Sequence, residues 1–253
     1  MSRKIFALTL VLIILSTLTA TGQTLDEILQ KYYEARGGYE KLKAVNTTKT
    51  TGNQLVQGLE IPFTILQKRP NLMRIEATVQ GQVIVKSYDG VSAWMINPLT
   101  GSTDPQILPE EQAKQIIEQA DFDGHLFDYK EKGHTVELIG KEDMEGTEVY
   151  KLKVTLKNGD IRYDYLDAEY FLELKVGAKI KRQEMELEAD TFVSDYKEVN
   201  GFMISHAMET KMGGNTVAQI VIKTVEFDVP IDDAVFKMPQ KTEPTEPIEP
   251  PKQ

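Results

Sequence analysis

The stretch that decides the fold of this chain is residues 68–98. It begins Lys68-Arg69-Pro70-Asn71-Leu72-Met73-Arg74, alternates apolar and polar residues to Tyr88-Asp89-Gly90, and ends Ala93-Trp94-Met95-Ile96-Asn97-Pro98. Pro70 cannot donate a hydrogen bond to a neighbouring strand, so it marks a strand boundary. The period-two runs that follow are separated by Gly81 and Gly90, which is typical of antiparallel strands joined by tight turns. None of these residues forms a pattern typical of a catalytic group.

The same period of two extends over most of the chain. It predicts strands over residues 47–56, 59–67, 74–79, 83–88, 93–96, 135–139, 148–156, 162–166, 171–176, 180–187, 192–197, 202–212 and 217–227. The turns between them contain pairs that accept a positive φ, namely Gln57-Gly58, Gln80-Gly81, Asp89-Gly90, Asn158-Gly159, Asn200-Gly201 and Gly213-Gly214. Such short turns join antiparallel neighbours, so we expect one long meander. A sheet of this size must curl, because a flat one would leave two long edges exposed.

Helical periodicity appears at two places. Thr24-Leu25-Asp26-Glu27 matches a capping box, and Gly37-Gly38 ends the helix that it begins. A short helical piece over residues 39–45 is expected next. One face of the first helix is apolar through Leu25, Ile28, Leu29 and Tyr32. The fold class predicted is α+β and mostly antiparallel β.

A later helix is expected from Pro109 to about Ala120, with Glu110 and Glu111 at its positive end. Its apolar stripe consists of Ala113, Ile116, Ile117 and Ala120. The helices and the curled sheet together predict a half-open barrel whose concave face is covered by helices. Whether its interior is packed or keeps a cavity is left open by the apolar pattern.

The two ends of the chain differ from the middle. Arg3 and Lys4 precede an apolar run over residues 5–18, and small residues follow at Ala20-Thr21-Gly22. This pattern predicts a signal peptide over residues 1–22, cleaved near Gly22, because the run is shorter than the roughly 20 residues of a membrane span. The segment 241–253 is rich in proline and predicts a disordered tail. Residues 23–240 are then expected to form one exported domain.

Charge and cysteine content restrict the partners. The net charge is −10, and it becomes −12 without the basic residues Arg3 and Lys4. An acidic protein is a poor match for nucleic acid, whose binding depends on clustered lysine and arginine. The chain has no cysteine, so we expect neither a disulfide framework nor a lipid-modified cysteine, and a soluble protein follows.

Enzyme chemistry finds little support. The three histidines are His125, His134 and His206, and neither a Gly-x-Ser-x-Gly elbow nor a phosphate loop is present. We therefore expect no enzyme and no catalytic residue.

A cluster of possible metal ligands consists of Asp121, Asp123, His125 and Asp128. It does not match a calcium loop, because Gly124 precedes the required sixth position and Lys132 replaces the bidentate glutamate. We interpret the cluster as a solvated turn and expect no metal site.

The central stretch resembles LolA, the periplasmic carrier of outer-membrane lipoproteins. The resemblance rests on Lys68-Arg69-Pro70-Asn71-Leu72, Asp89-Gly90, Trp94 and Asn97-Pro98. Later residues resemble a longer subgroup of outer-membrane lipoprotein-sorting proteins, through Ala120-Asp121-Phe122-Asp123-Gly124, Gly133-His134 and Asp232-Asp233-Ala234-Val235-Phe236. The resemblance implies a highly curved, incomplete LolA/LolB-like β-barrel with a helical lid over an apolar cavity.

The resemblance also implies a function. It implies a monomeric carrier that binds acyl chains of lipoproteins or other lipids without a cofactor and shuttles them towards the outer membrane. Its implied partners are an acylated lipoprotein or lipid, an inner-membrane releasing complex and an outer-membrane acceptor. One alternative is a sensor on the same fold that recognises lipoproteins or envelope stress and acts on a membrane partner. Another is a carrier of a different lipid, such as a glycolipid.

Particular residues follow from the resemblance. It implies that Arg69 bonds the lid backbone and holds the empty cavity closed, the alternative being a solvated charge at a strand end. Trp94 either anchors the barrel core or lines the cavity. The other candidates for lipid binding or for the lid are Leu72, Met95, Ile116, Ile117 and Phe122.

Overall fold

The computed structural model describes residues 23–182 and 185–240. The predicted signal peptide and tail therefore lie outside the described residues. Within the described part, thirteen antiparallel strands form one sheet in the order β6-β5-β4-β3-β2-β1-β13-β12-β11-β10-β9-β8-β7. The strands are β1 (Thr47–Val56), β2 (Leu59–Lys68), β3 (Leu72–Val79), β4 (Gln82–Tyr88), β5 (Ala93–Ile96), β6 (Gln106–Ile107), β7 (Thr135–Met144), β8 (Thr147–Thr155), β9 (Ile161–Asp167), β10 (Glu173–Arg182), β11 (Met185–Val199), β12 (Phe202–Met212) and β13 (Asn215–Phe227).

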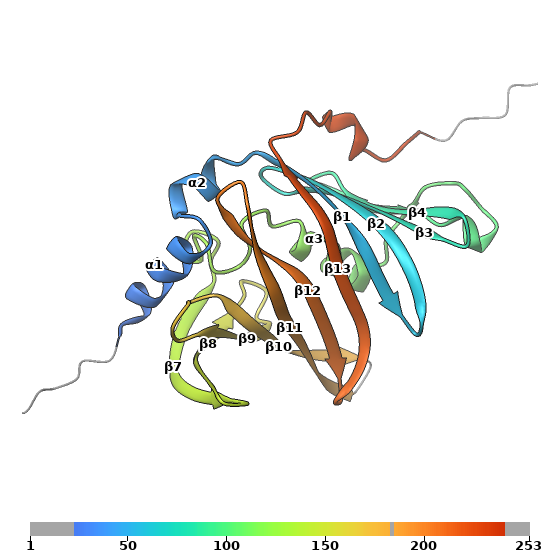
Figure 1. Ribbon diagram of the computed structural model, residues 1–253. Helices are drawn as coiled ribbons and strands as arrows, with labels where there is room; N and C mark the ends of the chain where they lie inside the picture. The colour runs from blue at the N-terminus through green and yellow to red at the C-terminus, as the bar shows by residue number, and fades with distance from the viewer. Residues whose placement is uncertain (1–22, 183–184, 241–253) are drawn as a thin grey trace, which may run out of the picture.

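The sheet is strongly curved and open. Figure 1 shows it bending round α3 and the loop after α3, while β6 and β7 remain as its two edges. The predicted fold class and incomplete barrel are confirmed. The expected single meander is wrong at one point, because β1–β6 and β7–β13 form two meanders joined where β1 pairs with β13.

The turn chemistry is confirmed at the glycine pairs. Gln57 and Gly58, like Asn200 and Gly201, both have positive φ, as a primed two-residue turn requires. Glycine is needed for another reason at Gly52, where a Cβ would lie 2.4 Å from the Val221 carbonyl oxygen. This close approach falls at a bulge between β1 and β13.

The strand boundaries were wrong in one region. The sequence predicted separate strands over residues 171–176, 180–187 and 192–197, whereas β10 continues to Arg182 and β11 runs from Met185 to Val199. Gly177 and Asp190 lie between the predicted strands, but they face each other in the β10–β11 ladder. A Cβ on Gly177 would lie 2.9 Å from Asp190 Oδ1. The absence of a side chain at Gly177 therefore leaves room for the side chain of Asp190.

The first helix, α1 (Leu25–Ala35), has the predicted capping box, in which Thr24 and Glu27 bond each other's backbone. It packs over β7, β8 and β9 through Ile28, Leu29 and Tyr32. The core beneath it contains Leu126, Phe127, Val136, Tyr150, Leu152, Val154, Leu156 and Leu166. The apolar face of α1 is therefore used for packing.

The second helix, α2 (Tyr39–Ala44), follows directly and buries no residue. The third, α3 (Glu110–Gln119), lies against β4 and β5. Ile116 and Ala120 are buried there, but Ile117 is 41% exposed, so the predicted apolar stripe is narrower than four residues. The core beside α3 also contains Met73, Tyr88, Ala93 and Leu108.

Two 3-10 turns also occur within residues 23–182 and 185–240, η1 (Pro98–Thr100) and η2 (Asp233–Val235). After η2, Phe236 is fully buried against β4 and β5. Its carbonyl oxygen accepts hydrogen bonds from Trp94 Nε1 at 2.8 Å and Ser87 Oγ at 2.9 Å. Trp94 thus fastens the end of the domain to its sheet.

Candidate functional site

A cavity of about 180 Å³ lies between the sheet and the segments that cover it. The sheet contributes side chains from β1, β2, β12 and β13, which are Thr48, Thr50, Gln67, Ile204, Ile222, Val225 and Phe227. The cover contributes Arg36, Leu42, Val45, Phe122, Asp123 and Phe127. The lining is mainly apolar, with a few polar groups, as expected of a binding site for an apolar molecule.

A larger hollow, of about 480 Å³, lies elsewhere on the molecule. It is lined by residues 102–106 near β6 and by Met238, Pro239 and Gln240 near the end of the described chain. The smaller cavity is the better candidate because it lies under a cover and its lining is more apolar.

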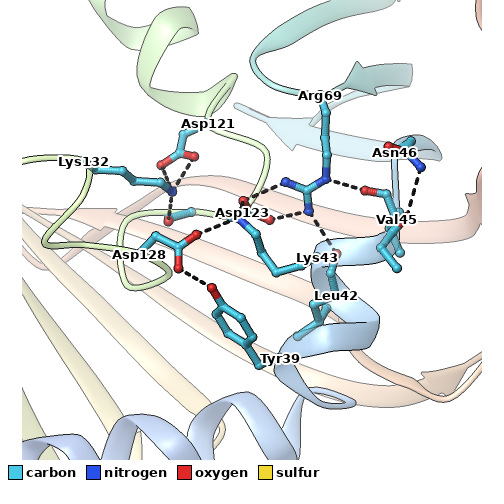
Figure 2. Close-up of polar contacts among 12 residues, drawn as sticks. Tyr39, Leu42, Lys43, Val45, Asn46, Arg69, Asp121, Asp123, Asp128 and Lys132 are labelled. Atoms are coloured by element: carbon cyan, nitrogen blue, oxygen red, sulfur yellow. Dashed lines mark hydrogen bonds and ion pairs between the residues drawn. The ribbon is translucent and has the colours of Figure 1, made fainter.

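Arg69 is hydrogen-bonded to three residues that line this cavity, Leu42, Val45 and Asp123, as Figure 2 shows. Its guanidinium group donates to both carboxylate oxygens of Asp123, at 2.8 and 2.6 Å. It also donates to the carbonyl oxygens of Val45 at 2.5 Å and Leu42 at 3.0 Å. These carbonyls lie at the end of α2, where a helix leaves such groups without partners. Arg69 therefore joins the turn between β2 and β3 to two covering segments.

Lys43 continues the same network from α2. Its Nζ donates to Asp123 Oδ2 at 2.9 Å and to Asp128 Oδ2 at 2.6 Å. Asp128 also accepts a 2.5 Å hydrogen bond from Tyr39 Oη, at the start of α2. We call Arg69, Lys43, Asp123 and Asp128 the latch, because their ion pairs fasten α2 and the loop after α3 to each other.

The titration behaviour of the latch follows from its geometry. Burial alone would raise the pKa of Asp123, but the hydrogen bonds from Arg69 and Lys43 outweigh burial and lower it. Burial likewise opposes the hydrogen bonds of Lys43 and Tyr39 to Asp128, and the pKa of Asp128 is lowered. Both carboxylates are therefore ionised at neutral pH, and the ion pairs are formed.

The four residues of the sequence-level metal cluster do not share one site. Asp123 and Asp128 belong to the latch, whereas Asp121 accepts hydrogen bonds from Lys132 at 2.6 and 2.7 Å. His125 Nε2 points instead to Asp164 on β9. The interpretation as a solvated turn does not describe these residues fully, because each of the three carboxylates accepts hydrogen bonds from specific side chains.

The predicted site residues lie in two groups. Phe122 lines the cavity, and the Arg69 guanidinium lies 4.6 Å from the centre of its ring. Trp94 is fully buried and lies outside the described cavity lining. The others belong to the N-terminal half of the sheet or to α3: Leu72 begins β3, Met95 is in β5, and Ile116 and Ile117 are in α3.

The sequence reading missed most of the cavity wall. Ile204, Ile222, Val225 and Phe227 lie on the last two strands, and Phe127 lies in the loop after α3. Strand alternation could have placed Val225 and Phe227 on one face of the sheet, but not Ile222, which shares that face only because of the bulge between β1 and β13. It could not show that this face lies opposite α2, because that depends on the pairing of β1 with β13.

The cavity is small compared with known ligand sites. A water molecule occupies roughly 30 Å³ in the liquid, and sites for drug-sized ligands usually measure roughly 300–1,000 Å³. A cavity of about 180 Å³ is too small for a long acyl chain. Binding of such a chain would require the cover to move away from the sheet.

Known proteins share this fold at low sequence identity. A LolA superfamily protein from Nitrosomonas europaea superposes with a TM-score of 0.60 and 14% identity, covering 85% of this chain and 98% of that one. A DUF1329 family protein from Desulfovibrio piger ATCC 29098 gives 0.59 and 14%, covering 84% and 96%. An outer membrane lipoprotein-sorting protein domain from Vibrio parahaemolyticus gives 0.56 and 14%, covering 83% and 94%. No family model and no curated protein matches the sequence.

The chain therefore has a LolA-like fold. Among the helices that the structure describes, none is long and apolar enough to cross a membrane.

Proposed function

We propose that this protein binds the acyl chains of lipoproteins, or of other lipids, in the cavity beneath α2 and carries them through the periplasm towards the outer membrane. The observation that carries the proposal is a mainly apolar cavity whose cover is fastened by ion pairs. The LolA-like fold supports the proposed lipid binding, and the signal-peptide pattern of the first 22 residues supports the proposed periplasmic location. We propose no catalytic step.

The physical reason for such a cavity is the cost of exposing an acyl chain to water. Each CH₂ group removed from water contributes roughly 0.8 kcal/mol, so even a partly buried chain gains several kcal/mol. The ligand chain would enter the space lined by Phe122, Val225 and Phe227 and enlarge it by moving the cover outward. The expanded cavity would then be filled by the ligand.

The cover must also be able to close again. The side chains of Arg69 and Asp123 are 19% and 10% exposed, so water can reach the latch once the cover shifts. Separating ion pairs that water can then hydrate costs less free energy than separating an apolar contact of the same area. Closure of the latch would compete with ligand binding and so favour release of the acyl chain.

A pair of tryptophan substitutions on β13 tests the binding site. Ile222 lines the cavity, whereas its neighbour Val221 is 53% exposed. Ile222→Trp should fill the cavity and weaken binding of a long-chain fluorescent fatty acid at least tenfold, while Val221→Trp should change it less than twofold. Equal effects of the two substitutions would refute binding in this cavity.

Transfer is tested separately with a synthetic diacylated lipopeptide. The protein loaded with the lipopeptide is mixed with acceptor liposomes, and the lipopeptide that reaches the liposomes is measured. A carrier should deliver it faster than the lipopeptide moves without protein. Binding without delivery would favour the sensor alternative, in which the loaded protein acts on a membrane partner.

A further inference from the structure

Three side chains from separate elements meet beneath α1, outside the latch. They are His125 in the loop after α3, Asp164 on β9 and Glu173 at the start of β10. One nitrogen or oxygen atom from each lies within 4.8 Å of the other two. His125 Nε2 and Asp164 Oδ2 are 2.7 Å apart.

Asp164 lacks a full set of partners. Its side chain is completely buried, and Oδ1 has no hydrogen-bond partner among the described residues. A buried carboxylate normally satisfies both oxygens, because the loss of water around a charged group is otherwise not repaid. The free oxygen therefore indicates that a ligand completes this cluster.

The local charge indicates that the ligand is a cation. The carboxylates of Asp164 and Glu173 lie together with the His125 imidazole, with one oxygen or nitrogen of each within 4.8 Å of the others, so two acidic groups share one aromatic nitrogen. The Arg36 guanidinium nearby donates its hydrogen bond to Tyr32 Oη at 2.9 Å. The side chain of His125 is 21% exposed, so an ion has a path from solvent.

We propose that His125, Asp164 and Glu173 bind a divalent cation, with Zn²⁺ as the best-matched ion. Imidazole nitrogen and carboxylate oxygen are common zinc ligands at distances of roughly 2.0–2.2 Å. Thiolate and thioether ligands, which favour softer ions, are not part of this set. Three protein ligands leave one position of a tetrahedral ion for water.

The site would have a structural consequence, which does not depend on what the cavity binds. His125 lies between Phe122 and Phe127, which both line the cavity, and it follows the latch residue Asp123 by two positions. A cation held by His125 and the two strand residues would tie this loop to β9 and β10. The loop after α3 would then stay attached to the sheet while α2 moves away from it.

Zinc titration of the full, untagged chain tests the proposal. After treatment with a chelator, calorimetry with Zn²⁺ should show one ion bound per chain, and zinc should raise the melting temperature. His125→Gln and Glu173→Gln should each weaken zinc binding at least tenfold. His134→Gln is the matched control, because His134 ends the same loop and its Nδ1 accepts only the Lys157 backbone N–H at 3.0 Å among the contacts described.

Two results would overturn the site. One is the absence of zinc binding by the wild-type chain at stoichiometric concentrations, and the other is zinc binding by the His125 or Glu173 variant that equals that of His134→Gln. If a variant fails to fold, X-ray absorption of the zinc-loaded wild-type chain decides. One imidazole nitrogen with oxygen donors supports the site, whereas no imidazole, or two, refutes it.

Discussion

The two consecutive helices α1 and α2 both reach the loop that carries Phe127, but they are held in place by different forces. The Tyr32 ring of α1 and the Tyr39 ring of α2 both contact the Phe127 ring, with centroids 6.1 and 5.9 Å away. Beyond this shared contact, α1 buries Ile28 and Leu29 in a close-packed core. Helix α2 has no fully buried residue: Tyr39 and Leu42 are only partly buried against the same core, and polar contacts to the end of the helix and to Lys43 also hold it.

This difference shows where the fold can move. Separating α1 from the sheet exposes a large apolar area to water, which opposes opening in proportion to that area. Separating α2 exposes a smaller apolar area, from the partly buried Tyr39 and Leu42, and exchanges ion pairs and hydrogen bonds for bonds to water, whose net contribution is small. Of these two helices, α2, which covers the cavity, therefore requires less free energy to displace from the sheet than α1.

The largest effect on stability should come from a substitution in the hydrophobic core under α1. Leu29→Ala removes a side chain that is 3% exposed and leaves a cavity in the core under α1. We expect the free energy of unfolding to fall by about 2–5 kcal/mol. Urea denaturation followed by circular dichroism measures this change.

The control for that substitution lies next to it on the same helix. Gln30 is exposed, so Gln30→Ala should change the free energy of unfolding by no more than about 0.5 kcal/mol. A loss as small for Leu29→Ala as for Gln30→Ala would show that α1 is not held by packing.

A smaller loss of stability, with a larger functional change, should come from the latch. Arg69→Leu removes both the bidentate pair with Asp123 and the donors to the end of α2. We expect a loss of about 1–3 kcal/mol and faster hydrogen exchange of α2 amides. Because the proposed role of the latch is to close the empty cavity, its loss should also strengthen acyl-chain binding and slow release.

The matched control is a solvent-exposed ion pair on the same sheet. Lys49 and Glu226 are 3.5 Å apart and 42% and 52% exposed, so Lys49→Leu should leave α2 exchange and acyl release unchanged. Unchanged α2 exchange in Arg69→Leu would contradict a latch role for Arg69.

The smallest effect should come from the local signal that begins α1. Thr24 Oγ1 accepts the Glu27 backbone N–H, and the Glu27 carboxylate accepts the Thr24 N–H at 2.8 Å. Thr24→Ala should cost about 1 kcal/mol, with the change confined to α1. A loss equal to that of Leu29→Ala, measured in the same urea titration, would mean that capping and not packing holds the helix.

The sequence predicts well what is encoded locally. The period of two, the glycine turns such as Asn200-Gly201, and the Thr24 capping box depend on residues close together in the chain, and the structure confirms them. The break expected near Gly177 is wrong because the residue that fills its space, Asp190, comes from the next strand.

The candidate site depends on contacts between distant residues, which local patterns do not reveal. Arg69 was singled out through a family resemblance, but its partner Asp123 lies 54 positions later. The sequence pattern does not distinguish Asp164 and Glu173 from other residues, because each is a single acidic residue within a predicted strand. They become a possible site only when His125 is placed between α1 and β9.

The pairing of β1 with β13 has a consequence for how the cavity arises during synthesis. Thr48 is opposite Phe227 in that ladder, and both side chains line the cavity. The two walls are thus separated by nearly the whole domain, and pairings of such high contact order form slowly. A nascent chain that has not yet released β13 from the ribosome lacks one wall of the cavity, so the proposed lipid binding would require synthesis to have passed β13.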